Sequence, residues 1–153
     1  MKMPKPILGI IADDFTGGTD IASMLRHGGM QVVQTIGPPQ PWFPVDADAL
    51  VIALKTRSVL VDDAISQSLS ALQSLLDMGV QCVQFKYCST FDSTPEGNIG
   101  PVSDALADAL GCGLVAHVPA LPVNGRSVFK GHLFVGNALL SASGMENHPL
   151  NPM

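Results

Sequence analysis

The sequence predicts an α/β domain with an open, mainly parallel sheet of Rossmann-like layout, flanking helices and a C-terminal antiparallel β-ribbon. Short, continuously apolar runs alternate with longer segments of helical period, and only 14% of the 153 residues are charged. Continuous apolar runs are typical of strands buried on both faces, and their alternation with helices is typical of parallel sheets. The length suits one domain, so we treat residues 1–153 as a single unit.

Five apolar runs of strand length are expected to form the parallel sheet. They cover residues 6–12, 30–36, 49–54, 80–85 and 114–118. Two further short runs, 126–130 and 132–135, are separated only by the residues around Gly131. Closely spaced runs joined by a glycine turn predict the antiparallel ribbon.

Three helices are expected between these strands, over residues 19–27, 62–78 and 99–110. The middle helix shows the clearest period. Its residues Ile65, Leu69, Leu72 and Leu76 recur at helical spacing, so we expect them to face the core.

The few cations are concentrated where the predicted sheet presents its loops. The net charge of −5 argues against a surface for nucleic-acid phosphates, so we expect no nucleic-acid partner. Five of the eight cations nevertheless lie at or just beyond the ends of apolar runs: Lys55, Arg57, Lys86, Arg126 and Lys130. An acidic chain that places its cations there is expected to bind a small anion.

Several functional classes are excluded by missing motifs. The three cysteines lack CxxC spacing, and Cys82 and Cys112 sit in or beside apolar runs, where we expect small buried side chains in a reducing cytoplasm. Asp13 ends the first apolar run too early for a signal peptide or membrane span. The histidines show no metal-ligand spacing, so we expect no metal site in the protein. GxGxxG, GxSxG and GxxxxGK[ST] are also absent.

Polar and charged residues cluster in the loops that follow the predicted strands. In open α/β sheets, ligands bind beyond the carboxyl ends of the strands. A hydroxylated carboxylic acid would need cations for its carboxylate, and carboxylates and amides for its hydroxyls. The candidate residues are Asp13, Asp14, Lys55, Arg57, Ser58, Lys86, Ser89, Asp92, Ser93, Asn124, Gly125 and Arg126.

Individual roles leave alternatives open. Asp14 and Asp92 are the two candidates for the base that accepts a proton from a reacting hydroxyl. Capping of the following helix is the alternative role for Asp14, and for Asp13 it is as well suited as a site role. Arg57 is favoured over Lys55 for the ligand carboxylate because a guanidinium matches that group with two hydrogen bonds. Ser58 suits local capping, and Arg126 suits either the site or the hairpin turn that Asn124-Gly125 predicts.

Four segments carry a resemblance to a known family: IADDFTGGTDIASMLRHGG, LKTRS, KYCSTFDSTPEGNIG and PALPVNGRSVFKGHLFV. They resemble the amino-terminal domain of the four-carbon acid sugar kinases, most closely the 3-oxo-tetronate kinase branch. The resemblance implies that residues 1–153 hold the sugar acid. It implies an enzyme that uses ATP and Mg²⁺ to phosphorylate the terminal C4 hydroxyl. It also implies substrate contacts near Asp14, Arg57, Lys86, Asp92 and residues 124–126.

The same resemblance implies a partner for the chain. A separate C-terminal domain supplies most nucleotide contacts in this family and is expected to be absent from this chain, so we expect the chain alone to be inactive. Two alternatives remain: a non-catalytic module that binds sugar acids, and an inactive truncated fragment. A cytoplasmic location without membrane attachment is expected, and a homo-oligomer is an open alternative.

Overall fold

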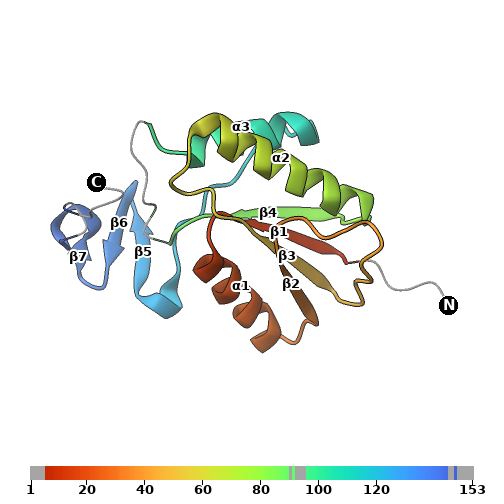
Figure 1. Ribbon diagram of the computed structural model, residues 1–153. Helices are drawn as coiled ribbons and strands as arrows, with labels where there is room; N and C mark the ends of the chain where they lie inside the picture. The colour runs from red at the N-terminus through yellow and green to blue at the C-terminus, as the bar shows by residue number, and fades with distance from the viewer. Residues whose placement is uncertain (1–5, 90, 92–95, 145–146, 148–153) are drawn as a thin grey trace.

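The computed structural model describes residues 6–89, 91, 96–144 and 147. Its main sheet has four parallel strands in the order β2-β3-β1-β4. The strands are β1 (Leu8–Ala12), β2 (Val32–Ile36), β3 (Ala49–Ala53) and β4 (Cys82–Lys86). Helix α1 (Phe15–His27) covers one face of this sheet, while α2 (Val61–Asp77) and α3 (Ile99–Leu110) lie on the other (Figure 1). The predicted α/β class is confirmed.

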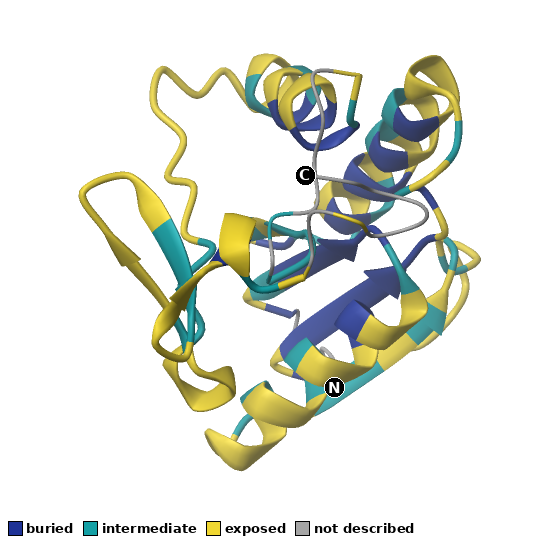
Figure 2. Ribbon diagram, turned by 90° about the vertical axis from the view of Figure 1, so that its left-hand side faces the viewer, coloured by how far each residue is buried: buried dark blue, intermediate teal, exposed yellow. Residues whose placement is uncertain are grey.

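The core lies on both faces of the two central strands. All five residues of β3 are buried, as are Ile10 and Ile11 of β1 (Figure 2). Leu50 and Ile52 pack under α2, whereas Val51 packs on the α1 side. Successive side chains of a strand point to opposite faces, so an unbroken apolar run serves both helical layers at once.

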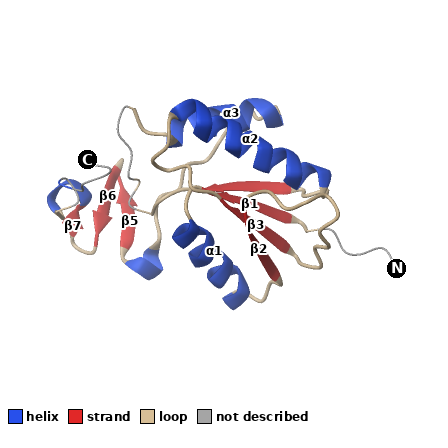
Figure 3. Ribbon diagram, viewed as in Figure 1, coloured by secondary structure: helices blue, strands red, loops and turns tan. Residues whose placement is uncertain are grey.

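A separate three-stranded antiparallel sheet confirms the predicted ribbon. It consists of β5 (Arg126–Phe129), β6 (His132–Val135) and β7 (Ala138–Leu139), in the order β5-β6-β7. The short helices η1 (Pro122–Asn124) and η2 (Leu140–Ala142) flank it. This sheet lies beyond the carboxyl ends of the main-sheet strands, on the side where ligands are expected (Figures 1 and 3).

Residues 114–118 do not form a strand, so the prediction of a fifth strand is wrong. The segment runs along the outside of the molecule between α3 and η1, and Leu114 and Val118 are 90% and 69% exposed (Figure 2). A strand requires a hydrogen-bonded neighbour, and within the described residues β4 pairs with β1 alone. Because this side of β4 is open, the prediction that Cys82 and Cys112 are buried is also wrong: both are exposed.

Helix α1 begins four residues earlier than its pattern predicts. Its N-cap is Asp14, so Gly17 and Gly18, expected in a loop, are buried residues of the first two turns. A Cβ on Gly18 would come within 3.0 Å of the Ala53 Cβ, so the missing side chain lets the helix lie close to β3.

The core-facing side of α2 is turned relative to the predicted stripe. Its buried residues are Ala64, Ser68, Ala71, Leu72 and Leu75, whereas Leu76 is 40% exposed. The prediction that Leu76 faces the core is therefore wrong. Leu75, which packs against the sheet at 0% exposure, takes that place.

Candidate functional site

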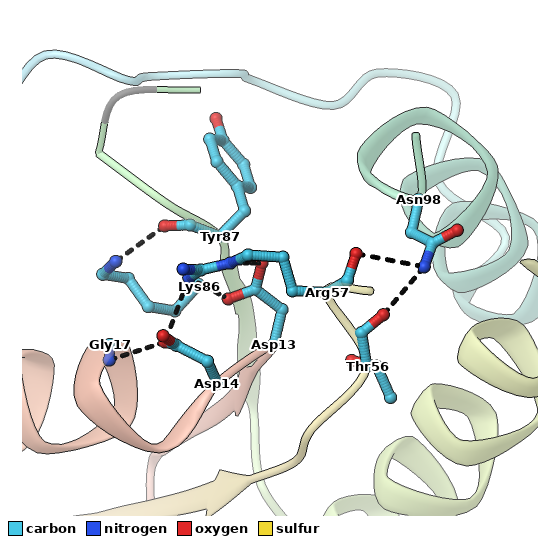
Figure 4. Close-up of polar contacts among 8 residues, drawn as sticks. All are labelled: Asp13, Asp14, Gly17, Thr56, Arg57, Lys86, Tyr87 and Asn98. Carbon is cyan, nitrogen blue, oxygen red and sulfur yellow. Dashed lines mark hydrogen bonds and ion pairs between the residues drawn. The ribbon is translucent and has the colours of Figure 1, made fainter. Parts of the chain in front are cut away.

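The centre of the candidate site is an ion pair between the ends of β1 and β3. Asp13 is only 3% exposed, and its carboxylate accepts two hydrogen bonds from Arg57, from Nε at 3.0 Å and from Nη2 at 2.8 Å (Figure 4). The main chains are also joined, because the Thr56 and Arg57 amides donate to the Asp13 carbonyl at 2.9 and 3.2 Å. The loop after β3 is thus fastened to the end of β1.

Asp14 combines a structural contact with a place beside the ion pair. Its Oδ1 atom accepts from the Gly17 amide at 2.7 Å, which caps α1, and lies 3.0 Å from Nη2 of Arg57 (Figure 4). The sequence left the helix cap open between the two aspartates, and the structure assigns it to Asp14. Both of these contacts use Oδ1.

Asn98 is a site residue that sequence reasoning missed. Its side chain is largely buried, and Nδ2 donates to the carbonyls of Thr56 at 2.8 Å and Val59 at 3.0 Å, with a longer contact to the Arg57 carbonyl at 3.4 Å. These bonds hold the loop that carries Arg57 from the side opposite β1 (Figure 4). An asparagine just before the apolar helical run 99–110 was the available signal, since such residues commonly bond to nearby backbone.

Lys86 supplies a second cation next to the two carboxylates. It ends β4, and its Nζ donates to the Tyr87 carbonyl at 2.6 Å. A Cβ placed on Gly17 would lie 3.4 Å from this ammonium, which shows how close it comes to the start of α1. The ends of β1, β3 and β4 therefore deliver two carboxylates and two cations to one place.

The charges of this cluster depend on each other. Burial raises the pKa of Asp13, and the charge of Asp14 adds to this, while the hydrogen bonds and charge of Arg57 oppose it. Burial would lower the pKa of Arg57, but the hydrogen bonds and charge of Asp13, with the charge of Asp14, outweigh it and raise that pKa. Arg57 is thus committed to the two aspartates, and Lys86 is the cation better placed for a ligand.

A cavity of about 580 Å³ opens above this cluster. Among the predicted residues, Asp14, Arg57, Lys86, Ser89 and Asn124 line it. Asn124 comes from η1, so the connection to the second sheet closes the side of the cavity. A volume of this order is typical of sites for small molecules.

One wall of the cavity is a polar face of α1 that sequence reasoning did not use. Thr16, Asp20, Ser23 and His27 line the cavity. They are spaced four, three and four residues apart, which places them on one side of a helix. This spacing was a visible signal, but it was missed because the helix was predicted to start only at residue 19.

Other predicted residues lie elsewhere. Lys55 and Ser58 are exposed, and Gly125 and Arg126 do not belong to the described lining of the cavity. The Arg126 guanidinium instead donates from Nη1 to the Asn124 carbonyl. Asp92 and Ser93 lie outside the described residues.

The described residues do not fit the Mg²⁺ and nucleotide that the family resemblance implies. Arg57 bonds to both Asp13 and Asp14, and no group of three or more His, Cys, Asp or Glu in the described chain is placed to hold a metal ion. The amino end of α1, where a phosphate would bind, is capped by the Asp14 carboxylate. In the described part, no helix is long and apolar enough to cross a membrane.

A family model and individual relatives assign this chain to the same family. The model of the "Sugar-binding N-terminal domain" family matches residues 8–153. A 3-oxo-tetronate kinase from Burkholderia multivorans is 58% identical over 149 residues, and one from Salmonella typhimurium is 59% identical over 146 residues. These matches cover 97% and 95% of this chain but 35% of each relative, so the chain spans about a third of their length.

Solved structures agree with these sequence matches. A Salmonella typhimurium protein described as a putative tRNA synthase superposes with a TM-score of 0.95 at 57% identity, over 98% of this chain and 36% of its own. A Bordetella bronchiseptica protein with bound citrate, described as a domain-swapped dimer, gives 0.83 at 29% identity, over 97% of this chain and 37% of its own. The resemblance noted in the sequence is confirmed, and the chain belongs to the family of sugar-binding N-terminal domains whose curated relatives are named 3-oxo-tetronate kinase.

Proposed function

We propose that this chain is the sugar-acid-binding half of a kinase that uses ATP to phosphorylate the C4 hydroxyl of a four-carbon acid such as 3-oxo-tetronate. The observation that carries the proposal is the cavity where Asp14, Arg57 and Lys86 meet at the carboxyl ends of three parallel strands. The names of the relatives support this choice of substrate and reaction.

The substrate carboxylate binds at Lys86 and Asn124 in this proposal. The ammonium of Lys86 donates to the Tyr87 carbonyl and has two further N–H donors, and the Asn124 amide also lines the cavity. Arg57 contributes its charge but presents Nε and Nη2 to the aspartates. The citrate bound by the Bordetella relative is also a hydroxylated carboxylic acid, which supports this ligand class.

The substrate hydroxyl to be phosphorylated binds at Asp14. The Gly17 amide and Arg57 hold this carboxylate by Oδ1, so its second oxygen is oriented before the ligand arrives. An oriented carboxylate is suited to accept the proton of that hydroxyl, and positioning of this kind is the main protein contribution to phosphoryl transfer. Asp92 is the second candidate for this base.

The phosphoryl donor and its Mg²⁺ are assigned to polypeptide outside this chain. The relatives have about two thirds of their length there, and the described residues fit neither group. ATP is a cytoplasmic metabolite, so the proposed reaction belongs in the cytoplasm. Alone, the chain is proposed to bind the acid without turnover.

Calorimetric titration of this chain with 3-oxo-tetronate, and with saturated four-carbon sugar acids, tests the binding step. Lys86→Met should weaken binding about 10-fold or more, because it removes a charge-assisted contact. Lys130→Met is the matched control, since Lys130 is exposed in the β5–β6 turn, and should leave affinity unchanged. Equal effects of the two substitutions would contradict the proposed carboxylate site.

A chimera tests the reaction itself. This chain replaces the matched part of the Salmonella typhimurium 3-oxo-tetronate kinase, and ATP-dependent phosphorylation of the same acids is measured. Asp14→Asn should lower turnover far more than substrate affinity. A folded chimera that binds the acid but never phosphorylates it would favour the non-catalytic binding module instead.

A further inference from the structure

A second cavity lies on the open side of the main sheet. It shares Lys86 and Ser89 with the candidate site, but its apolar lining takes no part in the proposed function. Its volume is about 600 Å³, and it runs between β4 and residues 112–121. We name it the edge slot. Its described lining is mostly apolar and includes Val83, Phe85, Leu106, Leu110, Leu114 and Val115.

One wall of the edge slot is an unpaired strand edge. The Cys82 amide donates to the Ile7 carbonyl, and the Lys86 carbonyl accepts from the Asp13 amide, so even-numbered residues of β4 direct their backbone groups towards β1. Backbone direction alternates along a strand. Val83 and Phe85 therefore direct their N–H and C=O groups into the slot, and β4 has no other partner among the described strands.

Helices enclose the slot on both faces of the sheet. Leu106 and Leu110 of α3 line it on one face, and Ile21 and Met24 of α1 line it on the other. The slot is thus a continuation of the sheet layer between two helical layers. Exposed apolar side chains border it, since Met24 is 43% and Leu110 is 37% exposed.

The far wall is a strand-like segment without a sheet. Residues 114–118 have the sequence LVAHV, whose β-branched and apolar residues favour strands, yet Leu114 is 90% exposed. Tyr87, just beyond β4, holds the end of this segment. Its side chain bonds to the Val118 backbone, and its ring lies 6.0 Å from that of His117.

We propose that the edge slot receives an additional β-strand, which pairs with β4 on one side and with residues 114–118 on the other. The strand comes from the polypeptide that the relatives have outside the part matched by this chain. Since the chain covers only 35–38% of those relatives, they contain ample sequence to supply it. Binding turns LVAHV into the strand that its sequence predicts and completes a six-stranded sheet.

The chemistry of the slot favours a polypeptide strand over a small molecule. Its wall presents a regular row of backbone donors and acceptors, which only another extended backbone satisfies along its whole length. The apolar side chains above and below require an occupant with apolar residues on both faces. Such continuous hydrophobicity is typical of a strand buried between two helical layers.

Hydrogen exchange tests the proposal in this chain and in the chimera with the remainder of the Salmonella typhimurium kinase. In this chain the amides of Val83 and Phe85 should exchange rapidly, in contrast to the β1-paired amides of Cys82 and Gln84, which serve as internal controls. In the chimera the Val83 and Phe85 amides, and those of residues 114–118, should exchange about 100-fold more slowly or slower still. If the chimera does not fold, the matching segments of the intact Salmonella kinase provide the same comparison.

Three results would overturn the proposal. The first is rapid exchange of Val83 and Phe85 in the folded chimera. The second is slow exchange in monomers of this chain, which would mean that residues 114–118 already occupy the edge. The third is protection in this chain that grows with protein concentration alongside a dimer in light scattering, which would assign the slot to a second copy. None of these readouts depends on substrate binding or turnover, so the proposed function is tested separately.

Discussion

Replacing Asn98 with alanine isolates the contribution of a single side chain to the architecture of the candidate site. Asn98 is 9% exposed and donates to the carbonyls of Thr56 and Val59 at 2.8 and 3.0 Å. The substitution leaves both carbonyls without this donor in a buried place. Arg57 lies between them in the chain, so its loop loses one of its two attachments.

The magnitude follows from the number of carbonyls left unpaired. A buried polar group without a partner costs about 1–3 kcal/mol, and two such groups, partly relieved by water that enters the space, give about 2–4 kcal/mol. The third contact, at 3.4 Å to the Arg57 carbonyl, is too long to add a comparable amount. Domains of this kind are stable by about 5–15 kcal/mol, so the loss is a large fraction.

Urea unfolding followed by circular dichroism measures this effect. The midpoint should fall without a change in slope, because the same surface is exposed on unfolding. Asn137→Ala is the matched control, since Asn137 is exposed, and it should change stability by less than about 0.5 kcal/mol. Hydrogen exchange should also become faster at the Thr56 and Arg57 amides. A loss below about 1 kcal/mol with unchanged exchange would refute the assigned role of Asn98.

Three further substitutions test the contacts around the ion pair. Gly17→Ala places a Cβ 2.6 Å from the capping carboxylate of Asp14. The variant should be about 1–2 kcal/mol less stable than the control Gly100→Ala, whose Cβ meets nothing within 4 Å. Equal stabilities of the two variants in thermal unfolding would contradict this. Thr56→Val removes a buried hydroxyl that has no partner among the described residues and should be neutral or stabilising by up to about 1 kcal/mol, so a clear destabilisation would reveal an additional partner. Arg57→Lys keeps the charge but loses the two-bond pairing with Asp13, and a cost of about 1–2 kcal/mol is expected in the same assay; no cost would show that charge alone holds the loop.

Much of the layered fold could be predicted from local pattern. The apolar run that became β3 is buried along its whole length, and the helix predicted over residues 99–110 is α3, with Ile99, Val102 and Leu106 buried. These predictions succeed because burial on one or two faces imposes a period that is visible in the residues themselves.

The composition of the candidate site was also predictable, but its internal pairing was not. Asp14, Arg57, Lys86 and Asn124 follow strand ends or their connections and do line one cavity. Arg57 was expected to bind the ligand carboxylate, yet it bonds to Asp13 and Asp14. The guanidinium of Arg57 pairs with carboxylates 43 and 44 positions earlier in the chain. A pattern within one segment cannot predict a pairing between residues so far apart in the sequence.

By itself, the sequence determined the order of the four main-sheet strands and the three α-helices, the family, and the kinds of side chain that gather beyond the sheet. Only the tertiary structure decided that Asp14 caps α1, that Asn98 holds the Arg57 loop, and that residues 114–118 stay outside the sheet. The physical reason is that periodicity reports what one segment must bury, whereas pairing depends on which neighbour is present. LVAHV has the composition of a strand, and the open edge of β4 shows that composition alone does not make one.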